Sequence, residues 1–406
     1  MLTPSAPDAG QVLPALASPG RVLALVARGA AETRADIARL TGLARSTVSQ
    51  RVDLLIEHGF LDEAPDVGAS GRRLPRRLRL RTRDQLVVGI GLGATHCRVA
   101  LLDVGGQEVV SREEPLLISD GPEAVLEATV RTARALLAES GRSAASVRAV
   151  GAGVPGPVEF ATGRPVDPPI MPGWHLFPIP QYLAERLGAS ALVDNDVNVM
   201  ALAERHWVLP DVQHLLFVKV GTGIGSGVLA GGRLHRGAQG SAGDIGHIRV
   251  GADDAPCRCG NTGCLEAFAG GAALARRLTA SGVPAATAAD VARLVAAGDR
   301  TAVPMVREAG RRIGNVLSSL ITFFNPEAIV FGGALSSAHE LLAGVREAVY
   351  ERSHPLATQY LRIAASGTRE NAVARGAGLL AIDHALSPCQ VDGLLDGAAQ
   401  PTGAAP

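Results

Sequence analysis

The sequence is poor in aromatic residues and lysine, and it has no long apolar run. Aromatic residues make up 3% of the 406 residues and hydrophobic residues 47%, so the core must be built from Leu, Val, Ala and Ile. Lys219 is the single lysine, and arginine supplies the other basic side chains. No apolar run approaches the roughly 20 residues that span a bilayer, and we find no export signal. We therefore expect a cytoplasmic protein that does not bind a membrane.

Charge is balanced overall but divided unevenly along the chain. The formal net charge is zero, yet residues 1–83 hold 13 arginines against 8 acidic residues, and the remainder is acidic. A basic module on an acidic body predicts a polyanionic partner for the first part only. The length exceeds that of a usual single domain, so two or three domains are expected.

The N-terminal part has the pattern of a winged helix-turn-helix. Residues 1–18, rich in Ala, Pro and Ser, read as a flexible tail. Apolar spacing and capping residues then predict three short helices, over residues 21–29, 33–42 and 46–58. A strand begins near Phe60, and seven arginines lie within residues 71–83, where the wing would be. We therefore assign residues 19–83 to this domain.

Beyond residue 84 the sequence changes to an α/β pattern. Apolar runs predict strands over residues 85–91, 99–103, 109–117 and 147–154. A strand-rich opening recurs at residues 214–220, followed by a Gly-rich turn and a further strand. Two halves with similar openings predict a duplicated ribonuclease H-like core over residues 84–387. Residues 388–406 are expected to form a second flexible tail.

Cysteine is scarce, and three of the five cysteines lie close together. The segment Cys257-Arg258-Cys259-Gly260-Asn261-Thr262-Gly263-Cys264 follows shortly after Gly243-Asp244-Ile245-Gly246-His247. Three thiols and one imidazole are the ligand set of a closed structural zinc site, and glycine permits the tight turns that it needs. Such clustering favours a metal over disulfides. We predict structural zinc bound by His247, Cys257, Cys259 and Cys264.

Three Gly-rich turns follow predicted strands, where exposed backbone N–H groups can hold phosphate. Their candidate residues are Gly93, Thr95, Gly221, Thr222, Gly223, Gly332 and Gly333. Hairpin turns also use glycine, so each turn alone leaves both interpretations open.

A polar segment, Asp194-Asn195-Asp196-Val197-Asn198, follows a short apolar strand and opens a helix. A carboxylate there can take the proton of a sugar hydroxyl that attacks a phosphate, and amide side chains can bind other hydroxyls. Helix capping is the plainer alternative. Two Asp and two Asn exceed what a cap requires, so we favour a ligand site.

Together these motifs resemble the ROK family (repressors, open reading frames and sugar kinases), and specifically its winged-helix transcriptional regulators, over about residues 21–383. The resemblance implies an α/β fold with a two-lobed, actin/hexokinase-type ligand domain. It implies that the histidine and three cysteines bind zinc. It also implies a sugar site formed by Asn195, Asp196, Asp244, His247 and Glu266.

Two departures from the family pattern bear on activity. The kinases carry Asp-x-Gly-Gly-Thr at the first phosphate turn, whereas this sequence reads Gly91-Leu92-Gly93-Ala94-Thr95. Loss of that Asp should weaken ATP and Mg²⁺ binding, so we expect no kinase activity; Asp196 would be catalytic only if such activity were retained. Asp244 stands where the family usually has the longer Glu, which leaves the identity of the sugar open.

Polar side chains gather at the N-terminal end of the third predicted helix, the end that reaches base edges in helix-turn-helix proteins. The candidate DNA contacts there are Arg45, Ser46, Thr47, Ser49, Gln50 and Arg51. In the wing, phosphate or minor-groove contacts are expected from Arg72, Arg73, Arg76 and Arg77. A solvated helix face and a solvated charge run are the respective alternatives.

The sequence therefore predicts a sugar-responsive DNA-binding transcriptional regulator, of the repressor type, for carbohydrate uptake or catabolic genes. Its expected partners are operator DNA with an inverted repeat, a sugar or sugar phosphate, and further copies of the chain in a homodimer or homotetramer. An ATP-dependent sugar kinase with an appended DNA-binding domain is the first alternative. An adaptor that binds another protein is the second.

Overall fold

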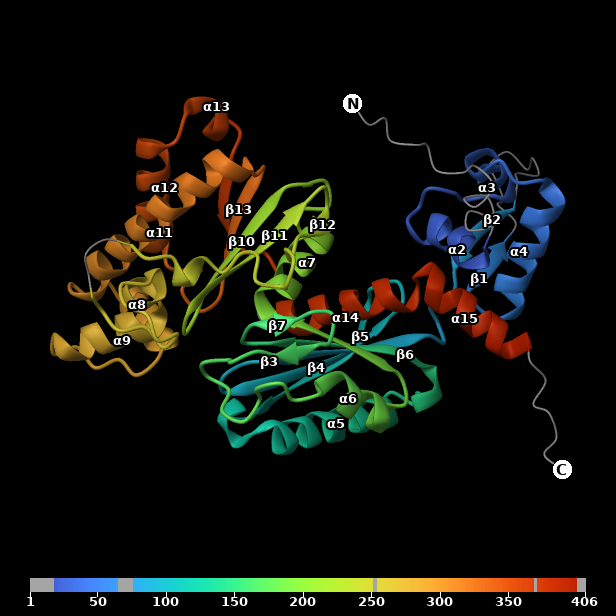
Figure 1. The fold of residues 1–406 in the computed structure, drawn as a ribbon, viewed down its shortest axis with the longest axis horizontal. Coiled ribbons are helices and arrows are strands. Elements are labelled where there is room, and N and C mark those ends of the chain that lie inside the picture. Colours follow the sequence, from blue (N-terminus) through green and yellow to red (C-terminus); the bar gives the residue numbers. More distant parts are fainter. Residues whose placement is uncertain (1–17, 65–75, 251–253, 369–370, 400–406) are drawn as a thin grey trace, which may run out of the picture.

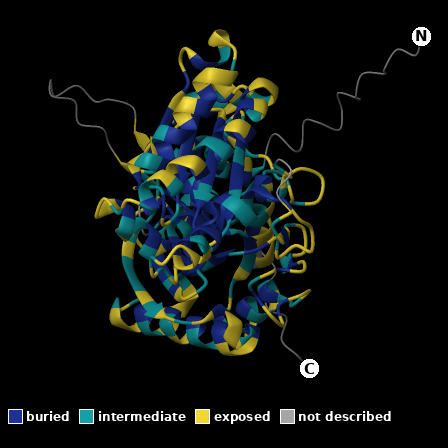
Figure 2. Ribbon diagram, turned by 90° about the vertical axis from the view of Figure 1, so that its left-hand side faces the viewer, coloured by how far each residue is buried: buried dark blue, intermediate teal, exposed yellow. Residues whose placement is uncertain are grey.

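The computed structural model describes residues 18–64, 76–250, 254–368 and 371–399. Its ribbon has three parts: a small, mostly helical head and two α/β lobes, with lobe 1 between the head and lobe 2 (Figure 1). Buried residues fill the middle of the molecule, and exposed residues follow its outer turns and loops (Figure 2). Within the described residues, no helix has the length and apolar character needed to cross a membrane.

The head begins with three helices and a two-stranded wing, as the sequence predicts. The helices are α2 (Pro19–Ala27), α3 (Arg34–Thr41) and α4 (Arg45–Glu57), and the wing pairs β1 (Leu61–Ala64) with β2 (Arg77–Leu80) antiparallel. Thr33 and Asp36 form a capping box that starts α3, because each side chain satisfies a backbone N–H of the first turn. Gly42, at φ 71°, ends it. The wing tip lies outside the described residues.

Lobe 1 is built on a five-stranded sheet in the order β5-β4-β3-β6-β9. Its strands are β3 (Leu86–Leu92), β4 (His96–Asp103), β5 (Glu108–Pro115), β6 (Val147–Val154) and β9 (Ser190–Asn195). Strands β3, β4 and β5 pair antiparallel, whereas β6 pairs parallel with β3 and β9 pairs parallel with β6. Helices α5 (Pro122–Glu139) and α6 (Ile179–Leu187) cover one face, α14 (Ala372–Ala385) covers the other, and a small hairpin pairs β7 (Val158–Glu159) with β8 (Arg164–Pro165).

Lobe 2 repeats this topology with the order β12-β11-β10-β13-β14. Its strands are β10 (Leu215–Val220), β11 (Ile224–Ala230), β12 (Arg233–Leu234), β13 (Ala328–Gly332) and β14 (Arg362–Ala365). Strands β10, β11 and β12 pair antiparallel, whereas β13 pairs parallel with β10 and β14 pairs parallel with β13. The remaining helices are α7 (Asp196–Trp207), α8 (Leu265–Ala269), α9 (Gly271–Ala280), α10 (Ala288–Ala296), α11 (Ala302–Phe324), α12 (His339–Arg352) and α13 (Pro355–Thr358). The repeated sheet confirms the duplicated ribonuclease H-like core.

Helices α7 and α14 lie between the two sheets and pack against each other. Glycines line the contacts of α14 with β6 and with α7, and so let the backbones approach closely. A Cβ on Gly151 of β6 would overlap the carbonyl oxygen of Ala377 in α14, and one on Gly376 would overlap that of Val199 in α7. A larger residue at either position would force α14 away from its partners.

The sequence predicted a flexible tail over residues 388–406, but its described part, residues 388–399, is a helix; residues 400–406 lie outside the described residues. Residues 388–399 form a helix, α15 (Pro388–Ala399), that continues from α14 and packs on α2 of the head. Val391 and Leu395 are buried in the head core, and the N–H of Gly20 donates to Asp392 Oδ1 at 2.7 Å. The expectation was wrong because the partner of this short apolar stripe lies more than 360 residues away in the sequence.

The head is therefore attached to lobe 1 by two connections. The first is the chain between β2 and β3, where the N–H of Arg81 donates to Phe60 O at 2.9 Å and Gln85 Nε2 donates to Gly59 O at 2.5 Å. The second is the continuous path from α14 into α15. Two connections restrict rotation of the head more than one linker would.

Two neighbouring leucines of α15 test this docking. Leu395 is 5% exposed and Leu394 is 48% exposed. We expect Leu395→Ala to destabilise the head by about 2–4 kcal/mol, because it leaves a cavity in the core, and Leu394→Ala to change stability by less than about 0.5 kcal/mol. Denaturant unfolding, with hydrogen exchange of the α2 amides to localise the effect, measures both. Equal losses from the two variants would contradict the docking of α15.

Candidate sugar site, metal site and nucleic-acid interface

The histidine and three cysteines predicted as metal ligands come together in lobe 2. One potential ligand atom from each of the four residues lies within 4.8 Å of the others. The Sγ of Cys257 is 3.5 Å from Nδ1 of His247, and the Sγ atoms of Cys259 and Cys264 are 3.7 Å apart. Three thiols and an imidazole in a compact group could hold a metal ion, and this donor set fits tetrahedral Zn²⁺.

Local backbone geometry brings the thiols together. The N–H of Cys257 donates to Asn261 O at 2.8 Å, and the N–H of Gly260 donates to Cys257 O at 3.1 Å. Gly260 closes this turn at φ 88°, a conformation that other residues resist. Burial, together with the adjoining Cys259 and Cys257 thiols, raises the pKa of Cys264 to about 12. Burial also raises the pKa of Cys259, but the Asn261 N–H and the neighbouring thiols outweigh it and lower the value to about 7.

The segment from Asp194 to Asn198 lies where β9 ends and α7 begins. Asn195 is the N-cap of α7: its Oδ1 accepts the N–H of Val197 at 3.0 Å, while its Nδ2 donates to Gly156 O at 2.8 Å. Asp194 Oδ1 accepts from the N–H of Asn195 and from Asn198 Nδ2. The capping interpretation is therefore correct for Asn195, and it fixes the direction in which the neighbouring Asp196 extends.

Arg236 connects this segment to the opposite lobe. Its Nε lies 2.8 Å from Asp194 Oδ2, whose side chain is 3% exposed, and its guanidinium lies 3.6 Å from the Phe160 ring centroid. Arg236 follows β12 of lobe 2, whereas Asp194 and Phe160 belong to lobe 1. The pair thus bridges the lobes beside the predicted sugar site. Arg236 was not predicted from the sequence, because nothing near it in the chain marks its partner.

Asp196, the candidate acceptor of a sugar hydroxyl, contacts the single lysine of the chain. Lys219 Nζ and Asp196 Oδ2 form an ion pair between β10 and the start of α7. The side chain of Asp196 is 6% exposed, whereas that of Lys219 is partly exposed. The ammonium takes up one carboxylate oxygen and offsets its charge. In the sequence, Lys219 stands out only as the single lysine, and nothing there connects it to the site.

The other expected sugar-site residues surround the turn between β10 and β11. Glu266 Oε2 accepts the N–H of Ile224 at 2.9 Å. Asp244 Oδ1 lies 4.0 Å from Nε2 of His247, the ring nitrogen on the side away from the thiol of Cys257. A Cβ on Gly246 would overlap Ile224 O, so this glycine lets the histidine loop lie directly on β11. The structure therefore gathers Asp196, Asp244, His247 and Glu266 around one hairpin, with Asn195 beside Asp196.

The predicted phosphate turns differ from a phosphate cradle in two places. A Cβ on Gly91 would lie 2.9 Å from the N of Ala374 and 3.0 Å from Cβ of Val373, so α14 fills the space that an Asp side chain would need. The ring of His96 crowds Gly93, whose N–H is already bonded to His96 O at 2.8 Å. Gly332 and Gly333 lie at the end of β13, beside Phe217 and Val220. At the first turn, these contacts leave no room for an acidic side chain at position 91 and take up the N–H of Gly93.

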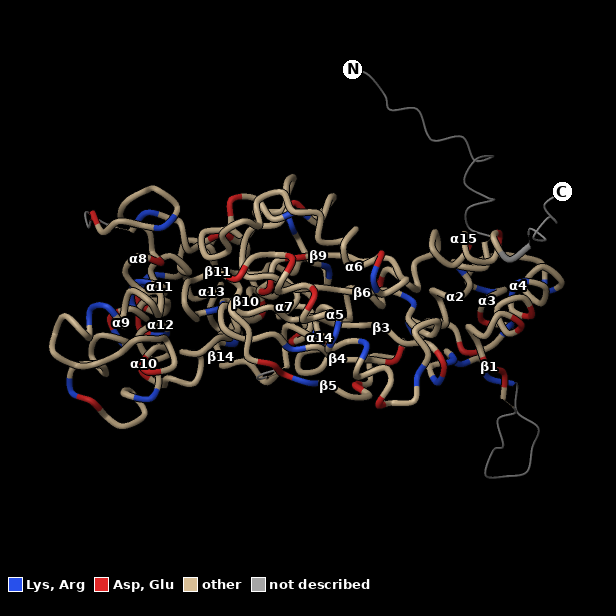
Figure 3. Tube along the Cα trace, turned by 90° about the horizontal axis from the view of Figure 1, so that it is seen from below, with Lys and Arg blue, Asp and Glu red and all other residues tan. Residues whose placement is uncertain are grey.

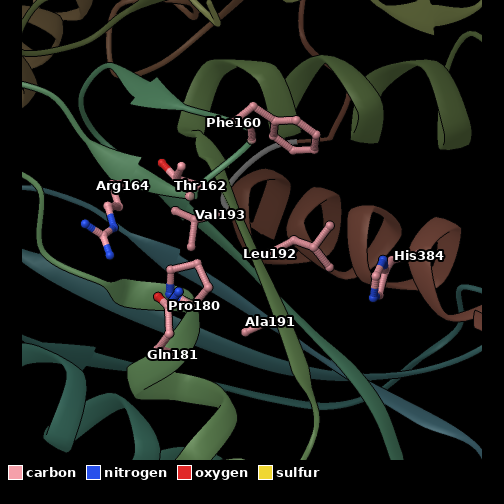
Figure 4. A pocket seen from close by; sticks show the side chains of 11 residues that line it. Phe160, Thr162, Arg164, Pro180, Gln181, Ala191, Leu192, Val193 and His384 are labelled. Carbon is pink, nitrogen blue, oxygen red and sulfur yellow. The ribbon is translucent and has the colours of Figure 1, made fainter.

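A cavity on lobe 1 is separate from this group. It lies between the β7–β8 hairpin, strand β9, the start of α6 and the end of α14, and Figure 4 shows Phe160, Leu192, Val193 and His384 around it. Its lining includes none of the five expected sugar-site residues.

In the head, the predicted DNA contacts lie at the start of α4. Arg45, Ser46 and Gln50 are exposed, whereas Thr47, Ser49 and Arg51 are partly buried. Arg51 Nε is buried and has no hydrogen-bond partner. Arg45, Ser46 and Gln50 thus form most of the accessible surface at this end of α4.

Arg34, which was not among the residues predicted from the sequence, fixes the position of α4. Its guanidinium donates to Glu63 at 2.9 Å, to Asp53 at 2.7 Å and to Ser49 O at 3.2 Å. The hydrogen bond with Glu63 raises the pKa of Arg34 above its already high value, against the lowering effect of burial. Arg34 therefore remains charged and ties α3, α4 and β1 together.

The arginines predicted for the wing fall into two groups. Arg72 and Arg73 lie outside the described residues. Arg76 lies 3.8 Å from Glu63, and Arg77 lies 2.6 Å from Glu32. Figure 3 shows arginine and acidic positions interleaved along this part of the trace. The basic charge of the head is therefore partly offset at its surface.

Comparison with known proteins accounts for this combination of parts. A model of the ROK family matches residues 87–384, and a model of the IclR helix-turn-helix domain matches residues 20–65. The chain belongs to the ROK family. It is 27% identical to a xylose repressor of Caldicellulosiruptor bescii over 372 residues, which cover 87% of this chain and 92% of the repressor.

Two solved structures match different shares of this chain. A ROK family transcriptional regulator, a homologue of the E. coli MLC protein, matches with a TM-score of 0.78 and 25% identity, covering 95% of this chain and 98% of the other. A ROK hexokinase from Thermus thermophilus matches with a TM-score of 0.63 and 33% identity, covering 73% of this chain and 98% of the hexokinase. The match to the regulator thus extends over more of the chain than the match to the enzyme.

Two cysteines provide a test of the metal site. We expect purified protein to hold about one zinc ion per chain. Cys259→Ser should weaken zinc binding by more than about tenfold, because losing a metal ligand costs at least as much affinity as losing a residue that hydrogen-bonds to a ligand. Cys389→Ser is the matched control, since Cys389 is exposed in α15 and outside the cluster. Elemental analysis after dialysis against a weak chelator measures both. Full zinc content in Cys259→Ser would contradict the assignment.

Proposed function

We propose that this ROK protein is a sugar-responsive transcriptional regulator, acting as a repressor of carbohydrate uptake or catabolic genes. The observation that carries the proposal is the physical continuity between the ligand domain and the head: α14 packs between the lobes, and α15 packs into the helix-turn-helix core. The relationship to a xylose repressor and to a ROK transcriptional regulator supports the same function.

The mechanism is a shift between two lobe arrangements. A sugar held by Asn195, Asp196, Asp244, His247 and Glu266 contacts elements of both lobes, so it favours one closure. Because α14 packs on the sheet of lobe 1 and on α7 beside lobe 2, a change in closure acts on α14 and, through α15, on the head. The sugar must bind the two arrangements with different affinity, or the equilibrium does not move.

Zinc has a structural role in this proposal. Four protein ligands leave no position for a reactive water, so the ion would contribute folding energy rather than catalysis. His247 would bind it through Nδ1, which leaves Nε2 on the side of Asp244 and the sugar. The metal would thereby fix the loop that carries two of the proposed sugar ligands.

A sugar kinase is less well supported than a regulator. The Gly91 position is packed against α14, which leaves no room for an acidic side chain at the first phosphate turn. This feature weighs against phosphoryl transfer, which depends on well-placed groups around the phosphates.

The head is proposed to bind an inverted repeat as part of a dimer, since one helix-turn-helix reads one half-site. Arg45, Ser46 and Gln50 would reach the major groove, with Thr47, Ser49 and Arg51 behind them. Arg76 and Arg77, with Arg72 and Arg73 of the wing, would contact phosphates and make binding salt-dependent.

Gln50 provides a test of the DNA interface. We expect Gln50→Ala to weaken binding to a genomic fragment retained by the unaltered protein by about tenfold, because a lost base contact costs about 1–3 kcal/mol. Glu57→Gln, at the opposite end of α4, is the matched control and should bind at least as well. Fluorescence anisotropy at two salt concentrations measures both variants. Unchanged affinity for Gln50→Ala would remove α4 from the interface.

A further inference from the structure

The chain passes between the two lobes at two places in the described residues (Figure 1). Helix α7 leaves β9 of lobe 1 and leads to β10 of lobe 2, and the chain returns from β14 of lobe 2 to α14 on lobe 1. The return begins with residues 366–368, which we call the crossing loop. A change in the angle between the lobes must involve both passages, because they are the covalent links between the lobes.

Glu204, near the end of α7, holds the crossing loop and is 1% exposed. Its Oε2 accepts from Ser366 Oγ at 2.6 Å and from Thr368 Oγ1 at 3.1 Å, and its Oε1 accepts the N–H of Gly367 at 3.1 Å. The N–H of Thr368 also donates to Oε2, at 3.3 Å. Hydrogen bonds to an ionised group are roughly twice as strong as neutral ones, and a buried carboxylate without them would be costly. The contact therefore ties the crossing loop to α7.

Two further contacts join the same parts of the chain. Arg375, near the start of α14, stacks on Trp207, the last residue of α7, with its guanidinium 3.8 Å from the ring centroid. A Cβ on Gly367 would lie 3.0 Å from both Cγ atoms of Val208, so the crossing loop packs directly on the residue that follows α7. The end of α7 and the chain entering α14 thus form one packed junction.

Helix α7 connects this junction to the proposed sugar site. It runs without interruption from Asp196 to Trp207, and the rise of an α-helix places Glu204 about 12 Å from Asp196 along the axis. Rigid secondary elements can carry energetic coupling between sites, so a displacement at the start of α7 reaches Glu204. Glu204 itself lies outside the group of proposed sugar ligands.

We propose that Glu204 passes lobe closure from α7 to α14 and so to the head. It is a positioning residue, which contacts neither the sugar nor DNA but makes the two passages between the lobes move together. The glycine contacts bring α14 close to α7 through shape alone, whereas Glu204 fixes the chain entering α14 through directed hydrogen bonds. This inference rests on the proposed function, because it takes sugar binding to change the lobe arrangement.

Glu204→Gln tests the inference in the full-length protein as purified. The amide keeps the size of the side chain but replaces one acceptor oxygen with a donor, so a donor of the crossing loop loses its partner. Calorimetry measures binding of D-xylose, D-glucose and N-acetylglucosamine, and fluorescence anisotropy measures binding to a genomic fragment retained by the unaltered protein, with and without each sugar. The coupling factor is the ratio of the DNA affinities without and with the sugar that changes them most.

The variant should keep both binding activities and lose the connection between them. Its affinity for sugar alone and for DNA alone should each stay within about threefold of the unaltered protein, while the coupling factor should move toward one by at least about fivefold. A purely structural role would instead weaken both affinities together. Glu185→Gln, which changes an exposed carboxylate on α6, is the matched control and should leave the coupling factor unchanged.

The crossing loop offers a change on the other side of the same contact. Thr368→Val removes the hydroxyl donor and keeps the shape of the side chain, so it should reduce the coupling factor in the same direction but by less than Glu204→Gln. The double variant Glu204→Gln/Thr368→Val should lose little more than Glu204→Gln alone, because both changes act on one contact.

The outcomes separate this inference from the proposed function. A coupling factor unchanged in Glu204→Gln and in the double variant would overturn the inference and leave a sugar-responsive regulator in place. Joint loss of sugar and DNA binding, or fully additive losses in the double variant, would also overturn it. If none of the sugars changes the DNA affinity of the unaltered protein, the proposed function is contradicted, and this inference with it.

Discussion

The close packing of α14 against its neighbours is the constraint on which the rest of the structure depends. Glycines in β3, β6 and α14 remove the side chains that would otherwise hold the backbones apart, and Cβ atoms on Gly89, Gly151 or Gly376 would overlap backbone carbonyls across the contact. A helix held this tightly between a sheet and a second helix cannot shift alone, because packed interiors have little free volume. Any change in the angle between the lobes must therefore act on α14.

That constraint connects three features that look independent in the sequence. The N-terminus of α14 fills the space beside Gly91, where a kinase has an acidic residue, and its C-terminus continues into α15 in the head. The proposed sugar site lies at the N-terminus of α7, the helix against which α14 packs. The N-terminus of α14 thus fills space that an acidic residue of a nucleotide site would need, and its C-terminus leads into α15, which anchors the DNA-binding head. This arrangement suits a ligand sensor better than a catalyst.

The sequence predicted what depends on short-range patterns. The cysteine cluster, the helices of the head and the strand-rich openings of both lobes are encoded within tens of residues, and the family resemblance ordered them into one fold that the comparisons confirm. Contacts between distant segments had no such signal. Val391 and Leu395 give a stripe too short to identify a docking helix, Lys219 and Asp196 are 23 residues apart on different elements, and Arg236 meets Asp194 across the lobes. Candidate site residues could thus be named one by one from the sequence, but their charge pairing could not.

The most direct test of the account is a selection of fragmented DNA from the source genome with purified protein, sequenced with and without a panel of uncharged sugars. The account predicts enrichment of an inverted repeat near sugar uptake or catabolic genes, and a change in that enrichment with at least one sugar. Enrichment that no sugar alters would contradict the coupling between lobes and head. No enrichment at low salt, where phosphate contacts are strongest, would contradict the assignment as a transcriptional regulator.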